Sequence, residues 1–261
     1  MTTIERTRFA PTPSGYLHLG NAFNFLLIDK FAKEKNAEIS LRIDDLDATR
    51  SRDEYLVDIF ETLEWLDLSY EHGPRGVDDF KRNYSQGLKK EYYREQLKKL
   101  NGLFACSCTR SDIKKISQDG IYPGTCRNQS LIFESEKNCL RYIYEAEHSL
   151  KDFVIWRKDD LPSYQLVSSI EDIDQHMTFV VRGIDLKNST EVQRKLIECL
   201  SDGKIHIHFL HHPLLIDENG AKLSKSEGSM SLKELRSNNP SSTIVKDQFE
   251  VWYEKIKDSI Q

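Results

Sequence analysis

The segment RFAPTPSGYLHLGNA, residues 8–22, sets two prolines and two glycines between a short apolar run and a helix-like run. The prolines restrict φ and stiffen the segment, whereas the glycines let the backbone approach a bound group closely. His18 comes just before the expected helix N-terminus, whose unpaired N–H groups and positive dipole end attract phosphate. This segment therefore predicts a phosphate-binding loop between a strand and a helix.

The residues around this loop alternate between strand-like and helix-like patterns. Residues 7–10 and 39–43 are expected to be strands on either side of a helix at 21–35, which is a βαβ unit. A further helix is expected at 51–66, with Ser51 as its N-cap in a capping box. We therefore predict an α/β fold with a Rossmann-like catalytic domain, in which phosphate binds where a strand leads into a helix.

The middle of the chain departs from this alternation. A polar helix is expected at 84–100, followed by an irregular, cysteine-bearing stretch at 103–128 that is typical of an insertion. Strand-like runs at 153–157 and 177–183 are expected to resume the α/β pattern.

Composition narrows the class of protein. The chain has 38% hydrophobic and 30% charged residues, which is typical of a soluble globular protein. No apolar run approaches the roughly 18–20 residues that cross a bilayer, and the N-terminus has no apolar signal region. We expect a cytoplasmic monomer without membrane contact. The net charge of −5 argues against a globally basic nucleic-acid binder, so phosphate contacts would come from local basic strings, with candidates at 89–99 and 109–115.

A second segment, KLSKS at residues 222–226, changes the interpretation of the first loop. Its two lysines lie between flanking glycines, and such a loop can bring ammonium groups to a departing pyrophosphate. By itself this loop is more often a solvated surface loop, and the first loop is as often a structural turn. The two together indicate a site for ATP.

HLGN at residues 18–21 resembles the HIGH motif of class I aminoacyl-tRNA synthetases, and KLSKS resembles their KMSKS motif. Asn21 stands where many members carry a second His, and Leu223 replaces Met, but the glutamate and glutamine subgroup often tolerates both. By this resemblance His18 and Lys225 would be catalytic, stabilising charge on the phosphates of ATP bound with Mg²⁺. The ATP-binding residues that it implies are His18, Gly20, Asn21, Lys222, Ser224 and Lys225.

Further segments, among them LRIDDLDATR at 41–50, are similar to glutamyl-tRNA synthetases. By that resemblance Arg8 and Arg182 would pair with the side-chain carboxylate of glutamate, because guanidinium groups bind carboxylates bidentately and would be left underpaired by the amide of glutamine. Asp44, where the family usually has Glu, would hold the α-ammonium group with Tyr164. The glutamate-binding residues that the resemblance implies are Arg8, Ala10, Thr12, Asp44, Tyr164 and Arg182.

Three of the five cysteines form the pattern C-x-C-x13-Y-x3-C in the inserted stretch. Cys106, Cys108 and Cys126 offer three thiolates, and structural zinc takes four ligands. Spacing alone leaves the fourth ligand open, with three buried free thiols as the alternative. The pattern resembles the zinc site of glutamyl-Q tRNA(Asp) synthetases, the truncated paralogues of glutamyl-tRNA synthetases, which implies Tyr122 as the fourth ligand of a structural zinc.

The resemblance runs from Arg8 to about Ser226 and implies four parts without an anticodon-binding domain. These are the first half of the catalytic domain (1–102), an inserted zinc-bearing subdomain (103–150), the second half of the catalytic domain with the KLSKS loop (151–226), and a short helical C-terminal segment (227–261).

The function that this resemblance implies is that of a ligase. It would activate L-glutamate with ATP, without needing tRNA, and transfer it to the queuosine at the wobble position of tRNA(Asp), so that the anticodon loop is its partner. The alternatives are a glutamyl-tRNA synthetase core that charges a tRNA 3′ end, and a non-catalytic synthetase-like module that binds tRNA. A pantothenate-activating type of nucleotidyltransferase shares both nucleotide motifs but does not explain LRIDDLD or VVRGID.

Overall fold

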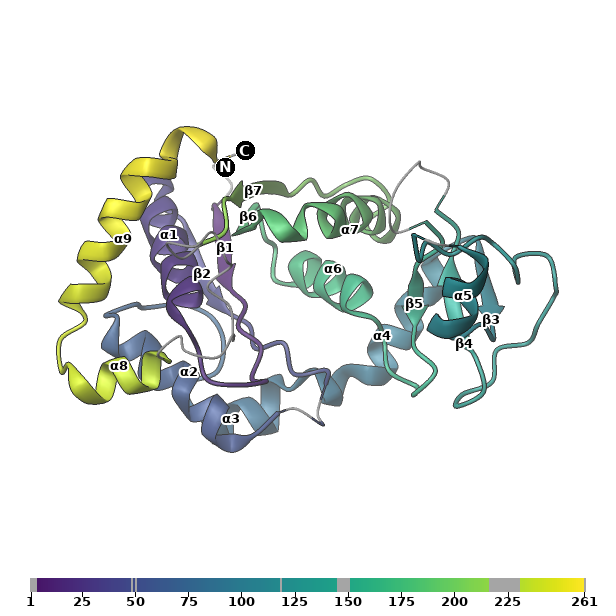
Figure 1. The fold of residues 1–261 in the computed structure, drawn as a ribbon, viewed down its shortest axis with the longest axis horizontal. Coiled ribbons are helices and arrows are strands. Elements are labelled where there is room, and N and C mark those ends of the chain that lie inside the picture. The colour runs from purple at the N-terminus through teal and green to yellow at the C-terminus, as the bar shows by residue number, and fades with distance from the viewer. Residues whose placement is uncertain are drawn as a thin grey trace. The chain divides into compact units, whose positions relative to one another are not determined.

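The computed structural model describes residues 4–47, 49, 51–117, 119–144, 151–215 and 231–260. They form two compact units, which are coloured by residue number in Figure 1. The first unit comprises Met1–Leu88, Gln175–Leu186 and Ile207–Gln261, and the second comprises Lys89–Asp174 and Lys187–His206. The chain thus leaves the first unit and returns to it twice.

Parallel strands form the centre of the first unit. β1 (Arg6–Phe9) pairs with β2 (Glu38–Leu41), and β6 (Phe179–Gly183) pairs with β7 (His208–His212). The N–H of Thr178 donates to the carbonyl of Arg6 at 2.9 Å, which sets the start of β6 beside β1. Parallel pairs need crossover connections, which helices supply here, so the predicted α/β class is confirmed.

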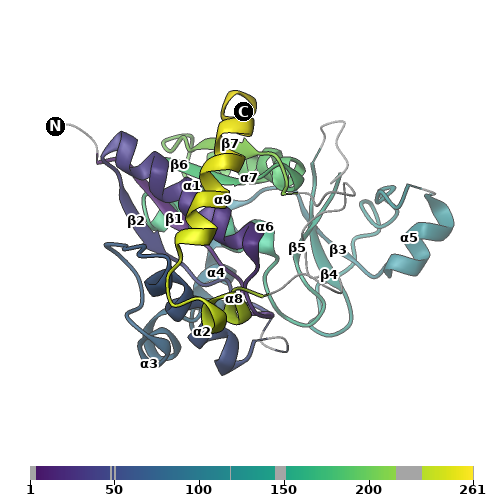
Figure 2. The same cartoon turned by 60° about the vertical axis from the view of Figure 1, so that its left-hand side comes forward.

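Helices cover these strands and close the core of the first unit. α1 connects β1 to β2, and α9 lies along α1, where the rings of Phe23 and Phe249 are 5.8 Å apart (Figures 1 and 2). Phe9 and Leu27 are fully buried between the strands and α1. The helices of this unit are α1 (Leu19–Lys35), α2 (Asp53–Trp65), α3 (Val77–Asp79), α8 (Leu232–Asn238) and α9 (Thr243–Ile256), with 3₁₀ turns η4 (Ile184–Leu186) and η5 (Lys257–Ser259).

The predicted capping box of α2 is wrong. Arg52, and not Ser51, is the N-cap of this helix, and it makes no side-chain capping bond. Asp53 and Glu54 occupy the first turn instead, where their negative charge is favourable beside the helix N-terminus.

The predicted helix at 84–100 is divided into short pieces. A π-helical turn, η1 (Phe80–Tyr84), is followed by the 3₁₀ turn η2 (Gln86–Lys89), then α4 (Lys90–Gln96) and η3 (Leu97–Lys99). Ser85 leaves the helical conformation with ψ 131°. Its hydroxyl and the N–H of Gln86 donate to the carboxylate of Asp45 at 2.6 and 2.8 Å, so a tertiary contact interrupts the helix.

The second unit contains an antiparallel sheet of order β3–β4–β5 (Figure 2). The stretch expected to be irregular supplies its first strand and α5, and the strand at 153–157 pairs antiparallel with β4 instead of resuming the α/β pattern, so that expectation was wrong. Within the described ranges no helix is both long and apolar enough to cross a bilayer. The elements of this unit, besides α4 and η3, are β3 (Leu103–Cys106), α5 (Arg110–Ile116), β4 (Cys139–Tyr142), β5 (Val154–Trp156), α6 (Tyr164–Asp174) and α7 (Lys187–Leu200).

Candidate functional site

His18 is the N-cap of α1 and has an extended backbone, with φ −128° and ψ 172°. Its Nδ1 accepts the N–H of Gly20 at 3.1 Å, and its own N–H donates to Oδ1 of Asn21 at 3.0 Å. This capping box gives Asn21 a structural function at the start of the helix. Because Nδ1 is the acceptor, the neutral ring carries its proton on Nε2, which makes Nε2 a donor for a group such as a phosphate oxygen.

Arg8, Ala10 and Thr12 follow one face of β1 and of the segment that continues it. Arg8 lies in register with Ser40 of β2, and successive strand side chains point to opposite faces. Arg8 is buried, with 4% of its surface exposed, whereas Thr12 is exposed. The three predicted glutamate-binding residues therefore lead from the interior of the first unit to its surface.

Asp44 continues this face from β2. Its N–H donates to the carbonyl of Pro11 at 2.9 Å, which prolongs the parallel pairing beyond the ends of the strands. Its carboxylate accepts two bonds from Arg42, at 2.7 and 3.2 Å, and one from Nε2 of Gln86 at 3.0 Å. Sequence analysis missed Arg42 and Gln86. The spacing of Arg42 and Asp44, two residues apart on one strand face, was the signal for the first of them.

Asp45, the next residue, also connects the end of β2 to the segment that contains Gln86, because its carboxylate accepts hydrogen bonds from Ser85 and Gln86. Burial raises the pKa of its carboxyl group, while the hydrogen bonds from Ser85 and Gln86 lower it. The side chain of Gln86 therefore binds Asp44 while its backbone binds Asp45. The end of β2 is thus fixed to η2 by neighbouring carboxylates.

Arg182 lies on β6, in register with His211 of β7. Its side chain is 4% exposed, and its guanidinium lies 4.7 Å from the centroid of the Phe209 ring. Stacking on an aromatic ring restricts the plane of the guanidinium and so favours bidentate contacts. Phe209 is a third residue that sequence analysis missed.

The remaining predicted residues lie elsewhere. Tyr164 starts α6 in the second unit, and 38% of its surface is exposed. Lys222, Ser224 and Lys225 lie outside the described residues. The structure therefore brings His18, Gly20, Asn21, Arg8, Ala10, Thr12, Asp44 and Arg182 into one compact unit.

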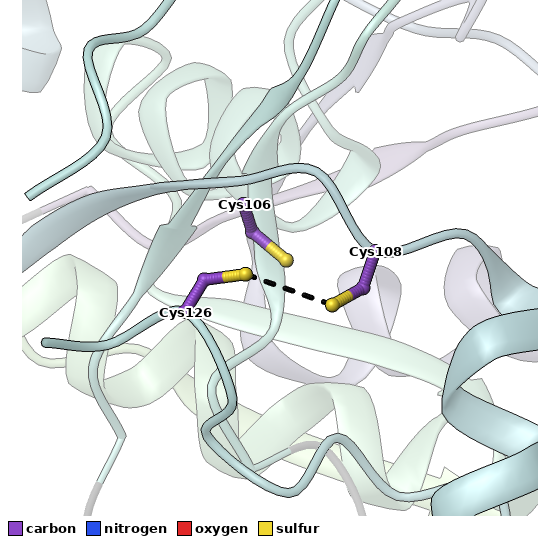
Figure 3. A group of neighbouring side chains, drawn as sticks. All are labelled: Cys106, Cys108 and Cys126. Atoms are coloured by element: carbon purple, nitrogen blue, oxygen red, sulfur yellow. Dashed lines mark hydrogen bonds between the residues drawn. The ribbon is translucent and has the colours of Figure 1, made fainter. Parts of the chain in front are cut away.

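The thiols of Cys106, Cys108 and Cys126 converge in the second unit (Figure 3). Their sulfur atoms all lie within 4.8 Å of one another, and those of Cys108 and Cys126 are 3.6 Å apart. Tetrahedral zinc with Zn–S bonds of about 2.3 Å sets its sulfur ligands about 3.8 Å apart, so this spacing fits the metal. No other group of three His, Cys, Asp or Glu side chains among the described residues is this close.

The phenol of Tyr122 faces the same point. Its oxygen lies 3.4 Å from Sγ of Cys106 and accepts the N–H of Cys126 at 2.7 Å. Its ring stacks on Phe104, and the guanidinium of Arg141 lies 3.8 Å from the ring centroid. Three sulfur atoms and one oxygen form a donor set of the number that zinc takes.

The thiols differ in acidity. Hydrogen bonding from Cys139 lowers the pKa of the Cys106 thiol to about 4, against the effect of burial. Burial and the bond to Cys126 raise the pKa of Cys108 to about 12, and burial raises the pKa of Tyr122. Zinc binds cysteine as the thiolate, so a metal bound here would release the protons of its ligands.

The two basic strings differ in how their charges are used. In the first, Lys89 pairs with Glu171 at 3.0 Å and Lys90 pairs with Asp160, so this string is partly neutralised inside the second unit. The second string forms α5, whose only acidic residue, Asp112, is held by Thr109 in a capping box. Its cations make no ion pair with any described residue, and they line a surface hollow of about 460 Å³ formed by Arg110, Ser111, Lys114 and Lys115.

Comparison with known families identifies the family of this chain. Residues 5–141 and 134–245 match the family of tRNA synthetases class I (E and Q), catalytic domain. The chain belongs to this family. Its members carry out ligase chemistry, and the predicted resemblance to class I synthetases of the glutamate and glutamine type is confirmed.

Members of the class I (E and Q) family with different names resemble this chain to a similar degree. A glutamyl-Q tRNA(Asp) synthetase of Symbiobacterium thermophilum is 33% identical over 262 residues, covering 88% of this chain and 80% of the relative. A glutamate–tRNA ligase of Sulfurihydrogenibium sp. is 32% identical over 265 residues, covering 89% of this chain and 55% of the ligase. The crystal structure of glutamate–tRNA synthetase from Elizabethkingia anophelis superimposes with a TM-score of 0.69 at 26% identity, over 87% of this chain and 53% of that one. The chain thus spans about half the length of the glutamate–tRNA ligases that it matches.

Proposed function

We propose that this protein activates L-glutamate with ATP in the cytoplasm and transfers it to the queuosine of the tRNA(Asp) anticodon loop. The observation that carries the proposal is the composition of the first unit. It combines an α1 N-terminus capped by His18 with two buried arginines, Arg8 and Arg182, on its parallel strands. Such a unit offers donors for phosphate and guanidinium groups for a carboxylate.

Glutamate is the amino acid that this charge distribution favours. Arg8 and Arg182 would bind its side-chain carboxylate, and glutamine would leave both buried guanidinium groups underpaired. Asp44 would hold the α-ammonium group. Because Asp44 already binds Arg42 through two bonds, it would share its charge between a guanidinium and the substrate.

Activation requires no protein nucleophile. An oxygen of the glutamate α-carboxylate forms a bond to the α-phosphorus of ATP, the bond to the bridging oxygen breaks, and pyrophosphate leaves with that electron pair. His18 would donate from Nε2 to the phosphate, and Lys225 would approach the leaving group. Mg²⁺ bound with ATP would screen the phosphate charges. A nucleophile of queuosine then attacks the acyl carbon, and AMP leaves.

The thiol cluster is proposed to hold one structural zinc through Cys106, Cys108, Cys126 and Tyr122. The sulfur spacing and the phenol oxygen beside it support this assignment. The metal would fix the connection between β3 and the loop that follows α5. The exposed cations of α5 are our candidates for RNA phosphate contacts.

A glutamyl-tRNA synthetase core is the second candidate. It is supported by the glutamate–tRNA ligase relatives, whose identity to this chain is close to that of the glutamyl-Q relative. The two candidates differ in the acceptor, which is the queuosine base for one and the 3′ end of tRNA for the other.

Glutamate-dependent exchange of pyrophosphate into ATP, measured with and without tRNA, tests the activation step. We expect exchange without tRNA; strict dependence on tRNA would favour the second candidate, and no exchange with any standard amino acid would favour a non-catalytic module. Labelled glutamate is then offered with queuosine-bearing and queuosine-free tRNA(Asp). We expect label on the queuosine-bearing tRNA alone, and equal labelling of both would contradict the proposed acceptor.

A further inference from the structure

Asp58 is a buried carboxylate on α2, with 1% of its surface exposed. Its Oδ2 accepts the backbone N–H of Leu17 at 2.9 Å, and its Oδ1 accepts a bond from Arg236 of α8 at 3.2 Å. Leu17 is the residue before His18. Asp58 therefore joins the segment that leads into α1 to two helices that are distant in the sequence.

Leu17 is held through both of its backbone polar groups. Its N–H donates to Asp58, and its carbonyl accepts the N–H of Leu232, the first residue of α8, at 2.8 Å. On the other side of His18, the carbonyl of His18 accepts the N–H of Asn21 at 2.8 Å and starts α1. The backbone is thus restrained both before and after His18, which limits the directions in which the imidazole can point.

A buried carboxylate is stable only where its charge is compensated. Arg236 supplies that charge and is itself held by further acceptors on α2, Thr62 at 3.0 Å and Glu61 at 2.5 Å. Its guanidinium therefore has one fixed position beside Asp58, and Asp58 in turn has one fixed position beside Leu17.

A neighbouring residue repeats the connection among the same three segments. Tyr16 donates its hydroxyl to Glu54 of α2 at 3.0 Å and accepts a bond from Lys233 of α8 at 2.7 Å. The ammonium of Lys233 also lies 4.3 Å from the centroid of the Tyr16 ring. Two successive residues before His18 are therefore attached to both helices.

We propose that Asp58 is a positioning residue for His18. By holding Leu17 it keeps the His18 ring in the orientation in which Nδ1 accepts from Gly20, which leaves Nε2 as the donor of the neutral ring. The proposal rests on the proposed function for its effect on the rate. Asp58 does not contact ATP or glutamate in this role, so its loss affects the rate of activation more than substrate binding.

The test compares Asp58→Asn and Asp58→Glu with Glu61→Gln. Asp58→Asn sets an amide N–H against either Leu17 or Arg236, and Asp58→Glu keeps the charge but moves the carboxylate by one methylene. Glu61→Gln is the matched control, because the amide oxygen of Gln still accepts a hydrogen bond from Arg236, and residue 61 makes no bond to Leu17. In ATP–pyrophosphate exchange we expect kcat to fall about 10- to 100-fold in both Asp58 variants, with KM for ATP and for glutamate unchanged. We expect Glu61→Gln to behave like the parent protein.

The ¹⁵N shifts of the His18 ring supply a readout that does not depend on activity. The parent protein should show the shifts of the Nε2–H tautomer. The Asp58 variants should show ring ¹⁵N shifts averaged between the two tautomers. An unchanged ring and unchanged kcat in either folded Asp58 variant would overturn the proposal, and so would an equal loss in Glu61→Gln. If the parent protein shows no exchange, the proposed function has failed, while the ring shifts still decide the position of His18.

Discussion

At the scale of single residues, the signature positions are supported by the side chains next to them. Asn21 departs from the usual second His of the motif, and it closes the capping box with His18. Asp44 is held by Arg42, and the guanidinium of Arg182 lies over the Phe209 ring. A residue that stacks or pairs in this way loses less conformational freedom when a ligand binds, which favours a preorganised site.

We predict that Arg182→Ala abolishes most glutamate activation while ATP still binds. Removing one member of a buried charged contact costs about 2–4 kcal/mol, or at least about 30-fold in kcat/KM for glutamate. The activity of Arg182→Lys should lie between that of the parent protein and that of Arg182→Ala, because lysine keeps the positive charge but loses the bidentate guanidinium. Exchange kinetics and ATP titration measure both effects.

Arg82→Ala is the matched control for this prediction. Arg82 is exposed and its Nε donates to the carbonyl of Asp78, so its loss should leave exchange unchanged. Normal exchange by Arg182→Ala with glutamate would show that the substrate pocket lies elsewhere.

At the scale of elements, polar contacts between segments determine where helices stop. The run at 84–100 has a helical composition, yet it breaks at Ser85, which bonds to Asp45. In the second unit, the polar contacts of Asp160 hold the turn after β5. It adopts φ 58° and accepts bonds from Arg94 at 2.7 Å, from Trp156 at 3.1 Å and from Lys90.

We predict that Asp160→Asn destabilises the second unit in a pH-dependent way. Burial would raise the pKa of Asp160, but hydrogen bonds from Lys90, Trp156 and Arg94 lower it to about 2. Because this folded-state pKa lies below the unfolded value, the ionised form stabilises the protein above about pH 4, and this contribution is lost as the pH falls toward 2. Allowing for partial exposure, we expect a loss of about 1–2 kcal/mol at pH 7.

Urea unfolding of the parent protein and of Asp160→Asn at several pH values measures this difference. Asn tolerates the left-handed backbone conformation, so the substitution isolates the charge. Asp159→Asn is the control, since that carboxylate is half exposed and pairs with Arg157 at the surface. A stability difference that stays the same between pH 7 and pH 2 would contradict the role of the ionised carboxylate.

At the scale of the whole molecule, the chain is divided into a unit with parallel strands and a unit with an antiparallel sheet. The three clustered thiols belong to the second unit, where Cys106 ends β3 and Cys126 lies in the loop after α5. A metal there would join a strand to a loop that has little apolar core of its own, the group of Cys106, Ile113, Tyr122, Cys126 and Cys139.

We predict one zinc per chain, and that its removal destabilises the second unit selectively. Zinc bound by a folded site contributes directly to folding free energy, because the unfolded chain has no such site. Chelation or Cys126→Ser should therefore raise hydrogen exchange in β3 and β4 by at least about tenfold and leave β1 and β2 protected. Metal analysis measures the zinc content, and hydrogen exchange measures the local stability of the second unit.

Cys199→Ser is the control for this prediction. Cys199 lies on α7, where its thiol is 3.6 Å from the hydroxyl of Tyr142 and apart from the cluster. Its loss should leave the zinc content unchanged. A metal-free protein with the full stability of the parent would contradict the zinc assignment.

Local sequence patterns were sufficient for β1, β2, β6 and α1, because alternating and helical apolar spacing reflects burial on one side of an element. The same patterns indicated the thiol cluster through its spacing. They failed at Ser51, where helix α2 starts from Arg52 without a side-chain cap, and at 153–157, where the strand joined an antiparallel sheet. A strand pattern contains no information about the direction of its partner.

The sequence by itself determined the α/β class, the loop before α1 and the family, because these depend on short-range spacing and on motifs. Tertiary structure decided the partners of each charged group. The contact of Asp58 with Leu17 and Arg236 and that of Asp45 with Gln86 each join residues distant in the chain. Those pairings follow from which buried polar groups meet when the elements pack, since each must find a partner there.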